Sequence, residues 1–139
     1  MIQFFFEDCE AQSFINEKEL LKTVQVIDIE GFTEGDLSVV FCSDAYLLSV
    51  NKQYLNHDYF TDIITFSYVD GSKISGDFFI SIDRVSENAI QEGVSKQNEL
   101  ARVLIHGLLH LCGYNDKEAQ DVLVMRSKES KYLSMIGFT

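Results

Sequence analysis

The pattern of hydrophobic and polar residues predicts short strands and amphipathic helices that follow one another along the chain. Runs rich in β-branched and aromatic side chains indicate strands, and they cover residues 2–6, 36–43, 61–69 and 74–85. Apolar residues at helical spacing, some of them behind a capping Asn or Ser, indicate helices. These helices cover residues 16–32, 43–55, 86–113 and 116–137.

Turn signals separate these elements. The Asp-Gly dipeptide at 70–71 is typical of a hairpin, so the strands on either side of it are expected to pair with each other. Gly35 is expected to mark a turn, Gly93 to divide the long helical segment and Gly113 to end it. The prediction is an α+β fold with a mixed sheet of about four strands packed against four to five helices.

Length and composition fit one ordinary globular domain. The chain has 139 residues, 46% of them hydrophobic and 24% charged, so a single domain spanning 1–139 is expected. No apolar run approaches the roughly 18 residues of a membrane span. The N-terminus has an apolar patch but no basic lead, which is a poor match to a signal peptide. A cytoplasmic protein with no membrane association is therefore expected.

The net charge narrows the functions that the surface can support. It is −11, with a sequence pI of about 4.5, so the protein as a whole repels nucleic acids and acidic membranes. Any nucleic-acid substrate would need a local basic patch or a metal ion. The three cysteines, Cys9, Cys42 and Cys112, are odd in number and lack CxxC spacing, so reduced thiols are expected.

Two of the three histidines, His106 and His110, lie four residues apart in the apolar run LIHGLLHLCGYND. On a helix this spacing points both imidazoles from one face, where they can share a metal ion. Gly113 allows the chain to reverse and return Asp116, ten residues after His106, to the same ion. Three ligands at this spacing resemble a metzincin metalloprotease site, with the fourth position of the ion left open. Zinc, one ion per chain, suits imidazole and carboxylate ligands.

Other interpretations of these residues remain open. The two histidines could be ordinary helix residues, one satisfied in the core and one in solvent. Asn115 or Asp121 could replace Asp116 as the third ligand, and Cys112 lies close enough in sequence to be a ligand as well. Metallopeptidases carry a Glu after the first His as general base, but this chain has Gly107 there. Glu99, two helical turns before His106, is a candidate base, although a solvated side chain is the favoured interpretation.

At these residues the chain resembles a known family. HGLLHLCGYND is similar to the H-G-x-L-H-L-x-G-Y-D-H signature of the YbeY family of bacterial endoribonucleases. NKQYLNHDYFTDIITF is similar to its N-x-x-Y-R-G-x-D-x-P-T-D-V-L-S-F segment, and GDFFIS to its G-D-I-x-I-S strand. The resemblance covers roughly residues 36–135.

The chain departs from the family pattern at four positions. Asp116 stands where the family has its third metal-binding histidine, and Asn115 stands where it has aspartate. Leu55 replaces an arginine thought to serve the RNA substrate, and Phe60 replaces a proline. His57 is a candidate substitute for the missing arginine.

The resemblance implies a metal-dependent endoribonuclease that acts on single-stranded RNA in ribosomal RNA maturation, together with the ribosome or small-subunit assembly proteins. His106, His110 and Asp116 would hold the metal, and Thr61 and Asp62 would edge the cleft. The candidate phosphate contacts are Lys96, Arg102, Arg126, Lys128 and Lys131. Two alternatives remain: a metal-dependent peptidase or amidase, and a non-catalytic ribosome-assembly module whose structural metal has a fourth protein ligand.

Overall fold

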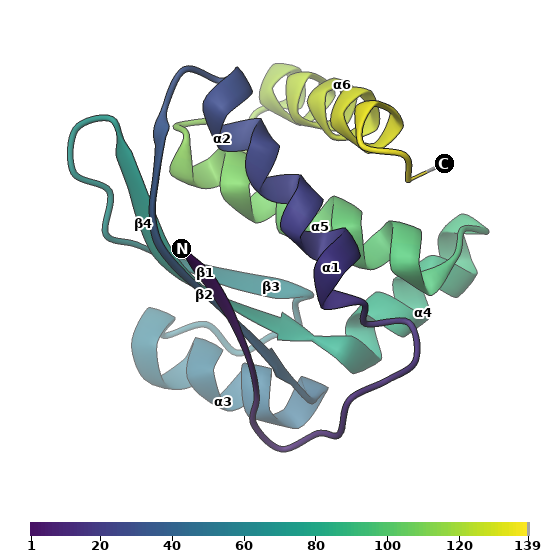
Figure 1. The fold of residues 1–139 in the computed structure, drawn as a ribbon. Helices are drawn as coiled ribbons and strands as arrows, with labels where there is room; N and C mark the ends of the chain where they lie inside the picture. The colour runs from purple at the N-terminus through teal and green to yellow at the C-terminus, as the bar shows by residue number, and fades with distance from the viewer. Residues whose placement is uncertain (139) are drawn as a thin grey trace.

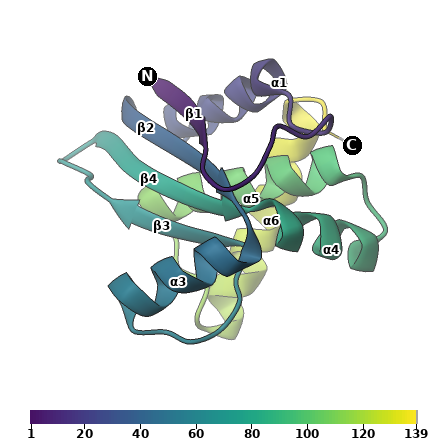
Figure 2. The ribbon, with the colours of Figure 1, turned by 90° about the horizontal axis from the view of Figure 1, so that it is seen from below.

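A computed structural model describes residues 1–138 as a four-stranded mixed sheet with helices on both faces (Figures 1 and 2). The strands are β1 (Ile2–Phe6), β2 (Thr33–Cys42), β3 (Ile63–Ser67) and β4 (Lys73–Ser81). The helices are α1 (Glu17–Leu21), the 3-10 turn η1 (Lys22–Val24), α2 (Gln25–Ile29), α3 (Asp44–Leu55), α4 (Ile82–Glu92), α5 (Lys96–Leu111) and α6 (Ala119–Met135). This confirms the predicted α+β class. No helix within residues 1–138 is both long and apolar enough to cross a membrane.

The strand order is β1-β2-β4-β3. β1 and β2 pair in parallel and are joined through α1, η1 and α2, as expected of a parallel crossover. β2 and β4 also pair in parallel, with α3 and β3 between them in the chain. β3 and β4 are antiparallel and joined by the predicted turn at 70–71, where Gly71 has φ of 60°. The hairpin expectation is therefore confirmed, and β3 forms one edge of the sheet.

The two faces of the sheet carry separate hydrophobic clusters. Alternate residues of β4, such as Phe78 and Ile80, belong to the main core together with α5. The intervening Phe79 packs on a smaller cluster beneath α3. Figure 1 shows α3 alone on one side of the sheet and α5 on the other, with α2 and α6 over α5. The helix that carries both histidines is thus clamped between the sheet and outer helices.

Two predicted segments differ from the observed elements. The strand expected to reach residue 85 ends at Ser81, whose hydroxyl accepts a hydrogen bond from the Arg84 backbone N–H at 3.1 Å and so starts α4. The single helix expected over residues 16–32 is broken by the 3-10 turn between α1 and α2. If this broken segment is counted once, residues 1–138 contain five helical segments. The division at Gly93 is confirmed, since its φ of 69° ends α4.

The turn expected at Gly35 was wrong, because Gly35 lies inside β2. The register with β4 shifts between Glu34 and Leu37, which indicates a bulge. A Cβ at Gly35 would lie 2.1 Å from Ser75 Oγ, so this glycine permits close approach of the two strands.

Gly107 allows α5 to lie close against the sheet. A Cβ at this position would come within 2.8 Å of two Phe78 ring carbons and 2.9 Å of Ile63 Cδ1. All three contacts are shorter than normal carbon–carbon separations. A side chain directly after His106, including the Glu of a peptidase motif, therefore has no room in this packing.

We predict that Gly107→Ala destabilises the protein by about 1–3 kcal/mol through overpacking. The direction of this change is informative, because Gly→Ala inside a helix otherwise stabilises a protein by about 1 kcal/mol. Urea denaturation of Gly107→Ala, of Phe78→Leu and of the double variant would measure the change in the free energy of unfolding. Phe78→Leu should offset part of the Gly107→Ala loss, and a more stable Gly107→Ala protein would contradict the packing argument.

Candidate metal centre

The two histidines project from the last two turns of α5, and a glycine turn follows them directly. The N–H of Gly113 donates to the His110 carbonyl and the N–H of Tyr114 to the Leu109 carbonyl, both at 3.0 Å. These bonds form a Schellman motif, with Gly113 at φ of 102°. The predicted reversal at Gly113 is confirmed, and it returns Asp116 to the histidine face.

Three potential ligand atoms converge in front of this helix face. His106 Nε2 and His110 Nε2 are 3.0 Å apart, and Asp116 Oδ2 lies 3.2 Å from the first and 3.3 Å from the second. Ligands roughly 2.0–2.1 Å from a tetrahedral zinc ion lie about 3.3 Å from one another. The spacing of the three atoms therefore fits a tetrahedral ion with one open position.

Both histidines are oriented through their other ring nitrogen. His106 Nδ1 lies 2.6 Å from Glu129 Oε2 and His110 Nδ1 lies 2.8 Å from the Tyr114 carbonyl. A carboxylate and a carbonyl only accept hydrogen bonds, so each Nδ1 must carry a hydrogen and donate. In the neutral tautomers, the two Nε2 lone pairs then face each other and the Asp116 carboxylate with no proton between them. This set of acceptors suits a cation.

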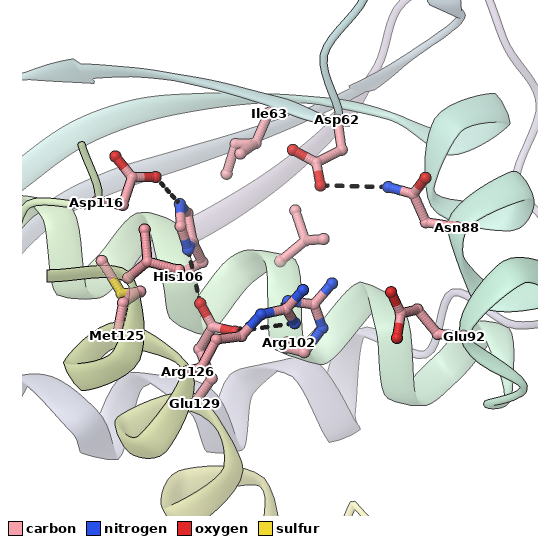
Figure 3. A pocket seen from close by; sticks show the side chains of 12 residues that line it. Asp62, Ile63, Asn88, Glu92, Arg102, His106, Asp116, Met125, Arg126 and Glu129 are labelled. Carbon is pink, nitrogen blue, oxygen red and sulfur yellow. Dashed lines mark hydrogen bonds and ion pairs between the residues drawn. The ribbon is translucent and has the colours of Figure 1, made fainter. Parts of the chain in front are cut away.

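A buried network supports the first histidine (Figure 3). Glu129 Oε1 accepts from Arg102 at 2.9 Å, and Arg102 donates two further bonds to Glu99, at 3.0 and 2.5 Å. Glu99 is fully buried, so the expectation of a solvated side chain was wrong. Its carboxylate binds the Arg102 guanidinium, which is what permits burial of both charges.

The network also sets the charges around the site. Burial opposes ionisation of Glu129, but hydrogen bonds and charge interactions with His106 and Arg102 lower its pKa below the usual value. Burial likewise opposes protonation of His106, whereas its bond to Glu129 and the charges of Glu129, Asp116 and Asp62 raise the pKa of the imidazole. The site therefore attracts positive charge, either a proton or a metal ion.

A second anchor fixes the turn that carries Asp116. The Glu30 carboxylate accepts from the Tyr114 hydroxyl at 2.6 Å and from Lys128 Nζ at 2.9 Å, and it also accepts from the Tyr132 hydroxyl. These bonds tie the residue after Gly113 to α2 and α6. The Tyr114 carbonyl, which orients His110, is held in place by the same anchor.

Neither anchoring carboxylate was identified from the sequence. Glu129 lies on the apolar stripe of α6 with Met125, Tyr132 and Leu133. An acidic residue on such a stripe is the signal that could have found it. Glu30 offered no comparable pattern, since its partners lie 84 to 102 residues away.

The other ligand candidates do not join the site. Within residues 1–138, the only group of three or more His, Cys, Asp or Glu side chains that could hold a metal is His106, His110 and Asp116. Asp121 and Cys112 are outside it, and Asn115 is exposed. Burial, together with the charge of Glu30, raises the pKa of Cys112 to about 11. The thiol is thus protonated at neutral pH and is a poor metal ligand.

Two pockets meet at the candidate metal ligands. One has a volume of about 380 Å³ and the other about 590 Å³. Asp62, Ile63, His106 and Asp116 line both of them. Figure 3 shows the smaller pocket, with Asp62, just before β3, across from His106 on α5. A long substrate could therefore pass on both sides of the three candidate ligands.

The structure brings some of the other predicted site residues to these pockets and leaves others away from them. Asp62 lies at their junction, 3.5 Å from Asn88 Nδ2, and Thr61 lines only the larger one. Arg102 and Arg126 line the smaller pocket. The three predicted lysine contacts line neither pocket and lie beside aromatic rings or Glu30: Lys96 over Phe14, Lys128 beside Glu30 and Tyr114, and Lys131 over Tyr132.

Comparison with known proteins agrees with this geometry. The family model described as Endoribonuclease YbeY matches residues 6–137. The Endoribonuclease YbeY of Flavobacterium psychrophilum is 49% identical over 130 residues, covering 94% of this chain and 89% of that protein. The Endoribonuclease YbeY of Parabacteroides distasonis is 43% identical over 136 residues, covering 97% of this chain and 95% of that protein.

A solved structure shares the fold. The solution structure of TM1509 from Thermotoga maritima superimposes with a TM-score of 0.68 at 27% identity, covering 98% of this chain and 89% of that one. The family match spans nearly the whole chain, and the relatives align over most of their own lengths. The chain belongs to the endoribonuclease YbeY family.

Proposed function

We propose that this chain is a metal-dependent endoribonuclease that cleaves single-stranded RNA and that its cellular substrate is precursor ribosomal RNA. The relatives named endoribonuclease support the reaction class. The observation that carries the proposal is the convergence of His106 Nε2, His110 Nε2 and Asp116 Oδ2 where the two pockets meet. The whole chain, residues 1–139, is proposed to act as one domain of this family.

The proposed metal is one zinc ion per chain, held by His106, His110 and Asp116. Two neutral imidazoles and a carboxylate are typical zinc ligands. A zinc ion there would supply positive charge that stabilises the charge developing on the phosphoryl group during cleavage. Glu129 and the Tyr114 carbonyl would keep both imidazoles in the tautomer that presents Nε2 to the ion.

Asp62 is the side chain we assign to proton transfer. It lines both pockets beside His106 and Asp116, and its only hydrogen-bonding side-chain partner within residues 1–138 is Asn88, at the long distance of 3.5 Å. Glu99 is a poorer base, because it is fully buried and bound twice by Arg102. The Thr61 hydroxyl donates to the Ile63 carbonyl at 3.4 Å and is not a base at neutral pH.

Phosphate binding is assigned to Arg126 among the predicted basic residues. Its side chain is 53% exposed and only loosely paired with Glu129, at 3.7 Å, so it keeps donors for a phosphate. The Arg102 side chain is 17% exposed, and its guanidinium is already bound by Glu99 and Glu129. Lys96, Lys128 and Lys131 remain predicted contacts for RNA that extends beyond the pockets.

The two alternative functions are less well supported. A peptidase needs a general base after His106, and Gly107 is packed too closely against Phe78 to be replaced by one. A structural metal site needs a fourth protein ligand. The described part of the chain offers no fourth His, Cys, Asp or Glu beside the three.

We also propose that the protein works in the cytoplasm with ribosomes or small-subunit assembly proteins. With a net charge of −11, it gains little from attraction to RNA phosphates. Contacts with a ribosomal protein would supply the missing affinity. Co-sedimentation with purified small ribosomal subunits tests this, and recovery of the protein only in the supernatant would contradict it.

We expect cleavage of single-stranded RNA to stop on chelation and to return with one equivalent of zinc. Duplex RNA should be cut much more slowly, and the rate on isolated RNA should be low because phosphate attraction is weak. A gel assay with matched single-stranded and duplex oligonucleotides measures both effects. Cleavage that survives complete metal removal, or equal cutting of the two substrates, would contradict the proposal.

Asp116→Ala should lower zinc affinity by about tenfold or more, since loss of even a supporting contact has that effect. Asp116→His should retain zinc, because it replaces one zinc-binding side chain with another. Asp121→Ala is the matched control and should change little. Competition with a coloured chelator measures all three. Parental affinity in Asp116→Ala would show that another residue is the third ligand.

Asp62→Asn should reduce the cleavage rate by about 100-fold or more, the usual range for a general base, while zinc affinity stays near the parental value. Asp58→Asn is the control, because Asp58 lies on the same loop and pairs with Lys52 but lines neither pocket. Single-turnover kinetics on single-stranded RNA separates chemistry from binding. An Asp62→Asn protein with the parental rate would exclude this role.

A further inference from the structure

An aromatic wall borders the larger pocket, which Arg126 does not line. Tyr59 and His57 line this pocket together with Leu55 and with the metal-ligating side chains. The Tyr59 and His57 rings stack on each other, with centroids 5.1 Å apart and planes 23° from parallel. Tyr59 is 56% exposed, so the stacked pair presents ring surface to the solvent.

The backbone beneath this wall is held in place. The Asn51 side chain, buried to 1% exposure, donates to the Tyr59 carbonyl at 2.9 Å. The Asn51 carbonyl accepts from the His57 N–H at 3.1 Å. Asn56, which directly precedes His57, adopts φ of 56° and ends α3. These bonds order the backbone of the exposed loop that carries the two rings, which lowers the ordering entropy that binding a flat ligand there would cost.

The charge of the pocket favours the neutral part of an RNA strand. Lys117 is the only Lys or Arg that lines it, whereas Asp62 and Asp116 are both acidic. Phosphates therefore gain little electrostatic binding energy along this wall before a metal is bound. An unpaired nucleobase is flat, uncharged and able to stack on an aromatic ring, with a contribution that depends little on its identity.

We infer that Tyr59, stacked on His57, is a binding site for an unpaired nucleobase of the RNA strand that enters the metal site. The inference rests on the proposed function and specifies how that substrate is held. The base would extend the stack of the two rings, while the adjoining phosphate would reach the metal ion that His106, His110 and Asp116 would hold. Paired bases are not available for such stacking, so this site would select single strands.

The test is equilibrium binding by the zinc-loaded protein, followed by fluorescence anisotropy in the cold. The probes are a fluorescein-labelled strand of ten adenosines and a strand of the same length with abasic residues, both checked on gels for integrity. The parent should bind the adenosine strand roughly tenfold more tightly than the abasic strand. Tyr59→Ala should abolish this difference, whereas Tyr59→Phe should keep it.

Tyr68→Ala is the matched control. Tyr68 is 60% exposed, but it lies outside both pockets and its hydroxyl donates to Asp77. Tyr68→Ala should bind both strands as the parent does. Equal binding of the two strands by the parent, or parental discrimination by Tyr59→Ala, would overturn the inference even if zinc-dependent cleavage is intact. Loss of discrimination in Tyr59→Ala would support it even if no variant cleaves RNA, in which case only the proposed reaction fails.

Discussion

The hydrogen bond from His106 Nδ1 to the buried Glu129 carboxylate is the interaction on which the rest of the site depends. It fixes the tautomer of His106, and the charge of Glu129 is in turn balanced by Arg102, which is bound to Glu99. Without Arg102, Glu99 would be buried without its counter-charge and Glu129 would keep as counter-charge only the loose pair with Arg126 at 3.7 Å, which is strongly unfavourable. The network thus supplies one directed lone pair to the metal site and joins α5 to α6.

The close contact between α5 and the sheet imposes a second constraint. Because Gly107 lies against Phe78 and Ile63, the helix cannot carry the base that a peptidase has next to its first histidine. The proposed proton-accepting group comes from another element, since Asp62 directly precedes β3 and lines both pockets. In the proposed site, the ligand spacing of a metalloprotease is thus combined with a different supply of catalytic groups.

The sequence was most informative where the contacts are local. His106 and His110 share a helix face, and Asp116 follows through a glycine turn, so their approach depends only on helix geometry and one φ angle. Glu129 and Glu30 reach the site through contacts 23 and 84 residues apart in sequence, which no local pattern encodes. Glu99 was misjudged for a different reason, because its counter-ion Arg102, three residues later on the same helix, makes its burial possible. The Gly35 turn failed because a bulge against β4 also favours glycine.

The coordination of zinc in the loaded protein tests the central claim most directly. X-ray absorption at the zinc edge distinguishes nitrogen and oxygen ligands, at about 2.0–2.1 Å, from sulfur at about 2.3 Å. We predict that zinc has two imidazole ligands and that all its other ligands are oxygen atoms. In Asp116→His the spectrum should change to show a third imidazole. A sulfur ligand, or an Asp116→His spectrum identical to that of the parent, would contradict the metal centre described above.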